Sequence, residues 1–262
     1  MKNTKSSLRI GAMITGVVVL LLLVGFFFTP YDPETMDAAN KLSGISLKHI
    51  MGCDHLGRDI FSRVLSGLRT TFLMGTATVL IGVFFGTILG AVCGYFGGWI
   101  DEILMRINDA VFAFPSILLA LVFIGIFGTG KYNVILALGI AFIPSFARIV
   151  RSEFLHCKNM DYVFCARLLG ASPLRIMFLH ILPNTKTVLL SAVMIGFNNA
   201  ILAEAGMSYL GIGVQPPDSS LGRMLSEAQT YLFSASWFAI FPGLMIIFMV
   251  LGFSLLADGL KK

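Results

Sequence analysis

Two polar side chains stand one helical turn apart inside an otherwise apolar stretch of the sequence. They are Glu204 and Ser208, and the segment around them continues without charge to Gly213. An ionisable group in such a setting is costly, so it usually lines a polar path or bonds to a neighbouring helix. Glu204 could therefore contact a substrate or form a structural hydrogen bond, and the sequence leaves both open.

A second group of reactive side chains lies between positions 54 and 63. Oppositely charged residues are neighbours there, and a helical repeat of apolar residues begins at Ile60. The residues that could form an external gate or interface are Gly57, Arg58, Asp59, Ser62 and Arg63. His49, Cys53 and His55 could bind a soft metal nearby, but their spacing matches no standard site, and no metal site is expected.

The sequence contains two partial matches to catalytic motifs, and each lacks a residue that its motif requires. The run from Gly125 to Lys131 imitates a phosphate-binding loop, but Tyr132 stands where that loop needs a hydroxyl for magnesium. Ser208 vaguely resembles the nucleophile of an intramembrane protease, yet Tyr209 replaces the glycine of that motif. We expect no catalytic residue, no cofactor bound by this chain and no ATP hydrolysis by it.

The composition shows which elements must hold these residues. Of 262 residues, 56% are hydrophobic and only 13% are charged, and the mean hydropathy is +0.86. Soluble domains contain about a quarter charged residues. The chain is therefore predicted to be an all-α polytopic membrane protein, and its net charge of +5 gives no reason to expect nucleic acid.

Uncharged stretches predict six transmembrane helices, because a helix needs about 20 apolar residues to cross a bilayer. The stretches are 10–31, 70–100, 111–130, 132–147, 187–203 and 228–257. The first resembles a signal peptide but lacks a convincing cleavage site, so we interpret it as an uncleaved span. Basic residues favour a cytoplasmic N-terminus, which six spans pair with a cytoplasmic C-terminus at Lys261 and Lys262. Residues 1–262 would form a single transmembrane domain.

Two polar segments are long enough for structure of their own. Residues 32–69 are expected outside, and their second half is predicted to form an amphipathic helix lying at the membrane interface. Residues 156–184 are expected in the cytoplasm, where Ser172 can cap a helix that starts at Pro173 and ends at Pro183. With Arg167 and Arg175 exposed, this segment is either a compact knob for a partner protein or a simple basic loop.

Glycines recur every fourth residue in the second span, at Gly82, Gly86, Gly90 and Gly94. Such a stripe lets another helix approach closely. It could also line a substrate groove, although close packing is the favoured interpretation.

The stretch from Tyr162 to Ser172, followed by Leu182 and Pro183, resembles the cytoplasmic "EAA" loop of ABC-importer permeases. Phe164 and Cys165 replace the Glu and the first Ala of that loop. The stretches 54–63 and 204–217 narrow the resemblance to the second permease of dipeptide, oligopeptide and nickel importers.

That resemblance implies an ATP-driven importer subunit in the cell's inner membrane. Its partners would be a homologous permease forming a heterodimer, two ATPase subunits that bind ATP and Mg²⁺, and an external substrate-binding protein. The residues implied in ATPase coupling are Ala166, Arg167, Leu169, Gly170, Ala171, Ser172, Leu182 and Pro183. Nickel or a metal chelate is slightly favoured as substrate over peptides, and a stand-alone secondary carrier is the alternative of another class.

Overall fold

The computed structural model describes residues 2–260, so Lys261 and Lys262 lie outside the described residues. This part of the chain is almost entirely helical, with one isolated β-bridge between Cys53 and Asp59. The α-helices are α1 (Lys2–Phe27), α2 (Ile60–Phe96), α3 (Gly98–Phe112), α4 (Ser116–Phe127), α5 (Lys131–Cys157), α6 (Asp161–Leu168), α7 (Pro173–Arg175), α8 (Lys186–Tyr209), α9 (Leu221–Ala228) and α10 (Trp237–Leu260).

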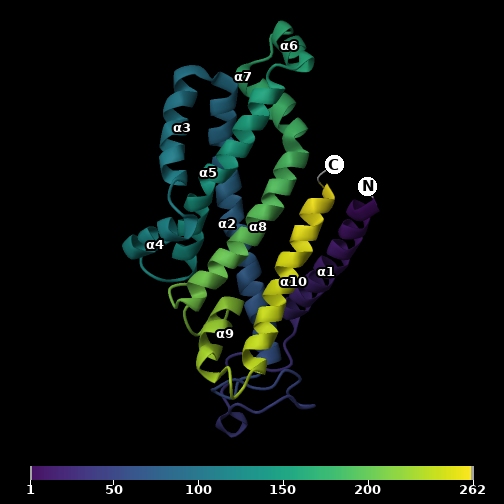
Figure 1. The fold of residues 1–262 in the computed structure, drawn as a ribbon, viewed down its shortest axis with the longest axis vertical. Coiled ribbons are helices and arrows are strands. Elements are labelled where there is room, and N and C mark those ends of the chain that lie inside the picture. Colours follow the sequence, from purple (N-terminus) through teal and green to yellow (C-terminus); the bar gives the residue numbers. More distant parts are fainter. Residues whose placement is uncertain (1, 261–262) are drawn as a thin grey trace.

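The described chain contains six candidate membrane spans, the predicted number, when one bent pair is counted as a span. Five helices are long and apolar enough to cross a bilayer by themselves, and one of them runs without a sharp bend from Pro173 to Tyr209. The segment of residues 28–59, which connects α1 to α2, lies with α9 at one end of the molecule, and α6 lies at the other end (Figure 1). The expected separation of the two polar segments is therefore present, while the cytoplasmic placement of the termini stays a prediction.

The third span is broken rather than straight. α3 and α4 meet at an angle of 88°, and α4 follows Pro115 directly. Proline cannot donate a backbone hydrogen bond and disfavours helical geometry at the residue before it. The uncharged run at 111–130 is thus split, and its missing length is supplied by the amphipathic α3.

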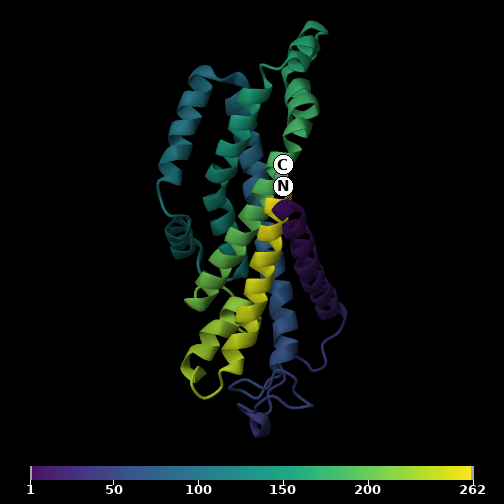
Figure 2. The same ribbon diagram turned by 45° about the vertical axis from the view of Figure 1, so that its right-hand side comes forward.

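Two ion pairs fasten α3 to α5. Arg151 binds both oxygens of Asp101 at 2.5 and 2.6 Å, and Arg148 binds Asp109 at 2.7 Å. Figure 2 shows α3 standing beside this helix bundle as a separate rod. Charged side chains therefore hold α3 against α5.

The predicted interfacial helix at 59–69 is wrong. These residues form the first turns of α2, which continues for 37 residues without a break. Ile60, Val64 and Leu68 are almost fully buried, so their helical repeat faces protein rather than the lipid interface. No proline lies between Ile60 and Phe96 to separate two helices, and Gly67 lies within the continuous helix.

The glycine stripe packs α2 against α5, as favoured from the sequence. A Cβ atom built on Gly86 would lie 2.6 Å from the Cβ of Phe146, and one on Gly94 would lie 2.6 Å from the Cβ of Phe154. Only glycine allows the two backbones this approach. The stripe is thus filled by protein and is not a groove.

Buried side chains form two clusters. The larger cluster includes residues of α1, α2, α4, α5, α8, α9 and α10. The smaller one joins the ends of α2 and α5 to α6 and the start of the α7–α8 rod, through Val150, Phe154, Val163, Ile176 and Met177 among others. The segment around α6 is therefore packed against the bundle and is not a free loop.

Candidate functional site

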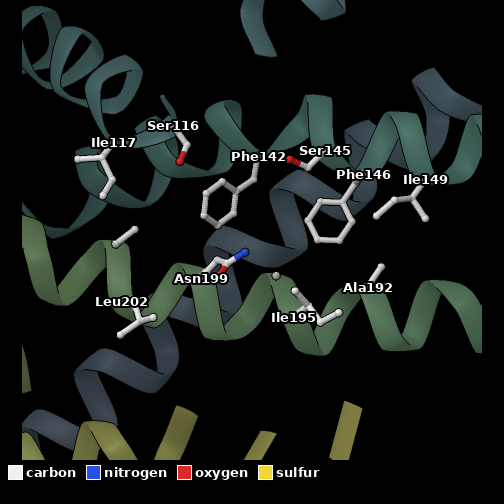
Figure 3. A pocket seen from close by; sticks show the side chains of 12 residues that line it. Ser116, Ile117, Phe142, Ser145, Phe146, Ile149, Ala192, Ile195, Asn199 and Leu202 are labelled. Atoms are coloured by element: carbon white, nitrogen blue, oxygen red, sulfur yellow. The ribbon is translucent and has the colours of Figure 1, made fainter. Parts of the chain in front are cut away.

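A cavity of about 380 Å³ opens between α4, α5 and α8. Figure 3 shows Phe142 and Phe146 of α5 pointing toward α8, with Asn199 of α8 pointing back. The lining residues are Ser116, Ile117, Phe142, Ser145, Phe146, Ile149, Ala192, Ile195, Gly196, Asn199, Leu202 and Ala203. The volume falls within the range of small-molecule sites.

The chemistry of the cavity is apolar with a few neutral polar groups. Ser116, Ser145 and Asn199 supply hydroxyl and amide groups that can donate and accept hydrogen bonds. Among the described residues that line it, none carries a carboxylate, imidazole, thiol or charged amine. The walls can hold a polar uncharged group such as an amide, but they offer no ligand of the kind that transition metals prefer.

Glycines also set the shape of this cavity. A Cβ on Gly196 would lie 2.6 Å from the Cζ of Phe146, and one on Gly82 would lie 3.2 Å from the same ring. The Phe146 ring is thus held between α2 and α8 and is only 2% exposed. These lining residues were not singled out from the sequence, although Asn199 inside an apolar span was an available signal.

Glu204 and Ser208 are placed away from the cavity. Both are buried, at 1% and 0% exposure, and Ser208 Oγ donates to Glu204 Oε1 at 2.7 Å. Ser208 Oγ also accepts from the backbone N–H of Val214 at 3.1 Å. The arrangement favours the structural interpretation of Glu204, in which the pair fixes the chain where α8 ends.

At the N-terminal end of α2, which is predicted to face outward, two arginines and two carboxylates form an ionic cluster. Arg58 Nε and Arg63 Nη1 both donate to Asp54 Oδ2, at 2.7 and 2.5 Å. Arg58 Nη2 and Arg63 Nη1 also donate to Glu227 Oε2, at 3.0 and 2.8 Å. We call these four residues the outer ionic cluster. It ties the 28–59 segment, α2 and α9 together.

The local fold explains how the cluster forms. Gly57 has a φ of +79°, which favours glycine, and the tight turn around it lets Asp54 Oδ1 accept from the backbone of Leu56 and Arg58. Asp59 then caps α2 by accepting from the backbone N–H and the hydroxyl of Ser62, both at 2.8 Å. The five predicted gate residues are thus brought together. Their role as a gate stays a prediction.

Glu227 is the member that the sequence did not reveal. It lies 164 positions from Arg63 on the short helix α9, and no local pattern links the two. His49 was considered as a metal ligand, but its Nδ1 contacts Asp59 Oδ1 at 2.8 Å, beside the cap of α2.

Electrostatics holds the cluster ionised. Burial alone would raise the pKa of Asp54 and of Glu227, but the neighbouring guanidinium groups outweigh it, and the pKa of each carboxyl is lowered. Asp54, His55 and Glu227 place possible ligand atoms within 4.8 Å of one another. Because two arginines already occupy the carboxylates, salt bridging explains this group better than metal binding.

The opposite end of the molecule carries the predicted knob. α6 ends with Gly170 at a φ of +79°, and Ala171 and Gly170 donate to the carbonyls of Ala166 and Arg167, a Schellman cap. Ser172 caps the next helix through the N–H of Arg175, at 3.4 Å, with Pro173 in the first turn. The break and the cap are confirmed.

The helix after Pro173 does not end at Pro183 as expected. It passes through a π-helical stretch at Ile176–Ile181 and a 3₁₀ stretch at Leu182–Thr185 before becoming α8. These wider and tighter turns accommodate a proline without breaking the rod. The segment is therefore a helical extension of a membrane span.

Exposure divides the coupling residues into two groups. Val163, Ile176 and Met177 are buried, and Ala166 is 8% exposed, so these residues hold the knob to the bundle. Leu168, Leu169 and Leu174 are 73%, 87% and 66% exposed. Arg167, Arg175, Gly170, Ser172 and Pro183 are exposed as well, while Ala171 and Leu182 are half-buried.

Comparison with known proteins identifies the fold and the family. Residues 82–262 match the family described as "Binding-protein-dependent transport system inner membrane component". A chain of the methionine ABC transporter MetNI, solved in an inward-facing conformation, superposes with a TM-score of 0.63 and 19% identity, covering 74% of this chain and 93% of that one. That similarity concerns the fold alone.

Two curated relatives cover almost the whole chain. The glutathione transport system permease protein GsiD of Pectobacterium atrosepticum is 43% identical over 95% of this chain and 85% of its own length. The dipeptide transport system permease protein DppC of Alkalihalophilus pseudofirmus is 37% identical over 96% and 83%. These relatives give no support to the expected preference for nickel. Membership of an ABC-importer family also argues against the alternative that the chain is a stand-alone secondary carrier. The chain therefore belongs to this permease family, as a non-catalytic, multi-pass subunit of an ABC importer in the cell's inner membrane.

Proposed function

We propose that this subunit forms half of the membrane path of an ABC importer for short peptides, with dipeptides and glutathione-like peptides as the substrate class. The observation that carries the proposal is the identity of 43% with a glutathione permease and 37% with a dipeptide permease, each over nearly the full chain. Substrate chemistry can differ between relatives at this distance, so the cavity provides a second, independent argument.

The cavity suits a peptide better than a metal ion. Ser116, Ser145 and Asn199 can exchange hydrogen bonds with peptide groups, and the exposed lining residues Ile195 and Leu202 give apolar surface for side chains. A hydrated metal cation would need carboxylate, imidazole or thiolate ligands, which the lining within residues 2–260 lacks. Nickel is therefore the weaker candidate on chemical grounds as well.

Three helices of this chain, α4, α5 and α8, supply the walls of the cavity. A homologous permease would close it and complete the path as a heterodimer. An external binding protein would deliver the peptide, and two ATPase subunits carrying ATP and Mg²⁺ would drive transport. No step of ATP chemistry is assigned to this chain.

The knob of α6 and α7 is proposed as the ATPase contact. Leu168, Leu169 and Leu174 form an apolar patch that is exposed in the isolated chain. A helical apolar surface of this kind fits a groove on a partner protein. Arg167 and Arg175 flank it and add charge at the rim.

Reconstituted uptake tests the substrate. The full transporter with its binding protein is placed in proteoliposomes, and ATP-dependent uptake of a labelled dipeptide is measured with glutathione or Ni²⁺ as competitor. We expect peptide competition and no effect of Ni²⁺. ATP-driven accumulation of Ni²⁺ without peptide uptake would contradict the proposal. Asn199→Leu should slow peptide uptake about three- to tenfold, the loss of one hydrogen bond.

Co-purification tests the ATPase contact. Leu169→Asp combined with Leu174→Asp places charges on the apolar patch and should abolish recovery of the ATPase subunits with the permease. Leu47→Asp is the matched control, because Leu47 is also fully exposed, at 104%, but lies in the segment at the opposite end. Intact recovery with the double variant would refute this contact.

A further inference from the structure

A second cavity, of about 480 Å³, lies beside the outer ionic cluster. Its walls come from the 28–59 segment, the Pro216 and Pro217 stretch, and α9. Its lining includes four charged residues, Glu34, Arg58, Arg223 and Glu227, together with His55, Met36, Leu56 and the two prolines. Its character is thus opposite to that of the neutral cavity between α4, α5 and α8.

The charges in this cavity are not all neutralised by one another. Arg58 and Arg63 are matched by Asp54 and Glu227, each guanidinium touching both carboxylates. Arg223 is a third guanidinium, and its Nε contacts the already shared Glu227 at Oε1, at 3.4 Å. Within residues 2–260, one positive charge is therefore left over at Arg223.

A free negative charge faces the same cavity from the other wall. Glu34 is exposed, lines the cavity and forms no salt bridge with another described residue. Arg223 on α9, which shares Glu227 with two other arginines, and Glu34 on the 28–59 segment give the cavity one cationic and one anionic pole. The molecule that complements two such poles is a zwitterion.

His55 adds an imidazole to the lining of the same cavity. Its ring stacks with Tyr231 at 5.4 Å and Phe238 at 5.9 Å between ring centroids, which fixes its orientation. Its Nδ1 is buried without a hydrogen-bond partner in the described chain. Buried polar atoms are rarely left unpaired in proteins, so this nitrogen is an unsatisfied polar atom in a residue of the cavity wall.

We propose that this outer cavity binds the zwitterionic ends of a peptide, with Arg223 receiving the carboxylate and Glu34 the ammonium group. An extended dipeptide spans about 7 Å, and the volume lies within the usual range for small ligands. Arg58 and Glu227 are recessed, at 7% exposure for Arg58, which favours a small ligand over a protein surface. The inference rests on the proposed peptide substrate and places a specificity site before the neutral path.

The test compares a labelled dipeptide with its C-terminal amide in the reconstituted transporter. Arg223→Gln should lower transport kcat/KM about tenfold for the free dipeptide, the value of a charge-assisted hydrogen bond, and leave the amide nearly unchanged. Arg223→Lys should keep part of the preference. Arg106→Gln, an exposed arginine paired with Glu102 on α3, is the control and should change neither peptide.

The binding protein is the same in every arm, so only the change in the ratio of the two peptides reports on Arg223. An equal loss for both peptides would assign the carboxylate to the binding protein and overturn the proposal, as would unchanged kinetics. If Arg223→Gln fails to assemble, Glu34→Gln with an N-acetylated dipeptide tests the other pole in the same way. Absence of any peptide uptake by the unaltered transporter would instead refute the proposed function, and this site with it.

Discussion

Asp54→Asn should strongly destabilise the protein, because Asp54 holds the outer ionic cluster together. Its side chain is 0% exposed. Oδ2 accepts from Arg58 and Arg63, and Oδ1 accepts from two backbone N–H groups. Asparagine can keep the backbone bonds, but its NH₂ group would then face two guanidinium donors. Both arginines would share Glu227 as their remaining carboxylate.

The expected cost follows from burial. Removing one partner of a buried ion pair costs about 3–5 kcal/mol, whereas an exposed pair contributes about 0–1 kcal/mol. Because Glu227 stays as counter-ion, we take the lower end, about 3 kcal/mol. A chain of this size loses about 2–4 °C per kcal/mol, so the midpoint of thermal unfolding should fall by about 10 °C.

The assay is thermal unfolding of the purified complex in detergent, followed by loss of the monodisperse peak in size-exclusion chromatography. Glu102→Gln is the matched control, since Glu102 also pairs with an arginine at 2.6 Å but is 62% exposed. The double variant Asp54→Asn with Arg63→Met leaves one arginine for one carboxylate in the cluster. Its loss of stability should therefore be smaller than the sum of the losses in the two single variants. A shift below about 2 °C for Asp54→Asn would refute the assigned role of the cluster.

Three further outcomes are expected. Gly86→Ala should lower the thermal midpoint by several degrees, because the added Cβ would lie 2.6 Å from the Cβ of Phe146 and overpacking costs about 1–3 kcal/mol. The control Gly16→Ala, with open space around the added Cβ, should leave the midpoint unchanged. The contribution of Asp54 and Glu227 to stability should be complete above about pH 4 and be lost below it as protons displace the arginines, because the folded pKa values of both carboxyls are lowered. An equal acid-induced fall in Asp54→Asn would contradict this source. Gly170→Ala should lower the stability of the protein by about 1–2 kcal/mol, since a φ of +79° is strained for alanine, and should reduce co-purification of the ATPase subunits. Unchanged co-purification and an unchanged thermal midpoint would show that the cap is dispensable.

Local rules were enough to find the elements but not their partners. The spans follow from uncharged runs, and the cap at Ser172 follows from a residue type one position before proline, both of which are local signals. The repeat at Ile60, Val64 and Leu68 also predicts a helix correctly. Its environment was misjudged, because an apolar helical face looks the same in a sequence whether it meets lipid or protein.

Long-range pairing explains the rest of what the sequence withheld. Nothing near Arg63 predicts Glu227, and nothing near Asn199 predicts the facing Phe142. The break at Pro115 had a visible cause, yet prolines also occur within continuous helices here, as Pro144 does in α5. Which proline bends a span is decided by the packing around it.

The way the knob is fastened limits how the path can open. Val163, Ile176 and Met177 share a buried cluster with Val150 and Phe154 of α5, so a force on the knob acts on α5 as well as on α8. α5 is in turn locked to α2 by the glycine stripe, since neither backbone can slide without a clash. The α5 and α8 walls of the neutral cavity should therefore move as one body. We expect opening and closing to occur against the partner permease, and not between these two walls.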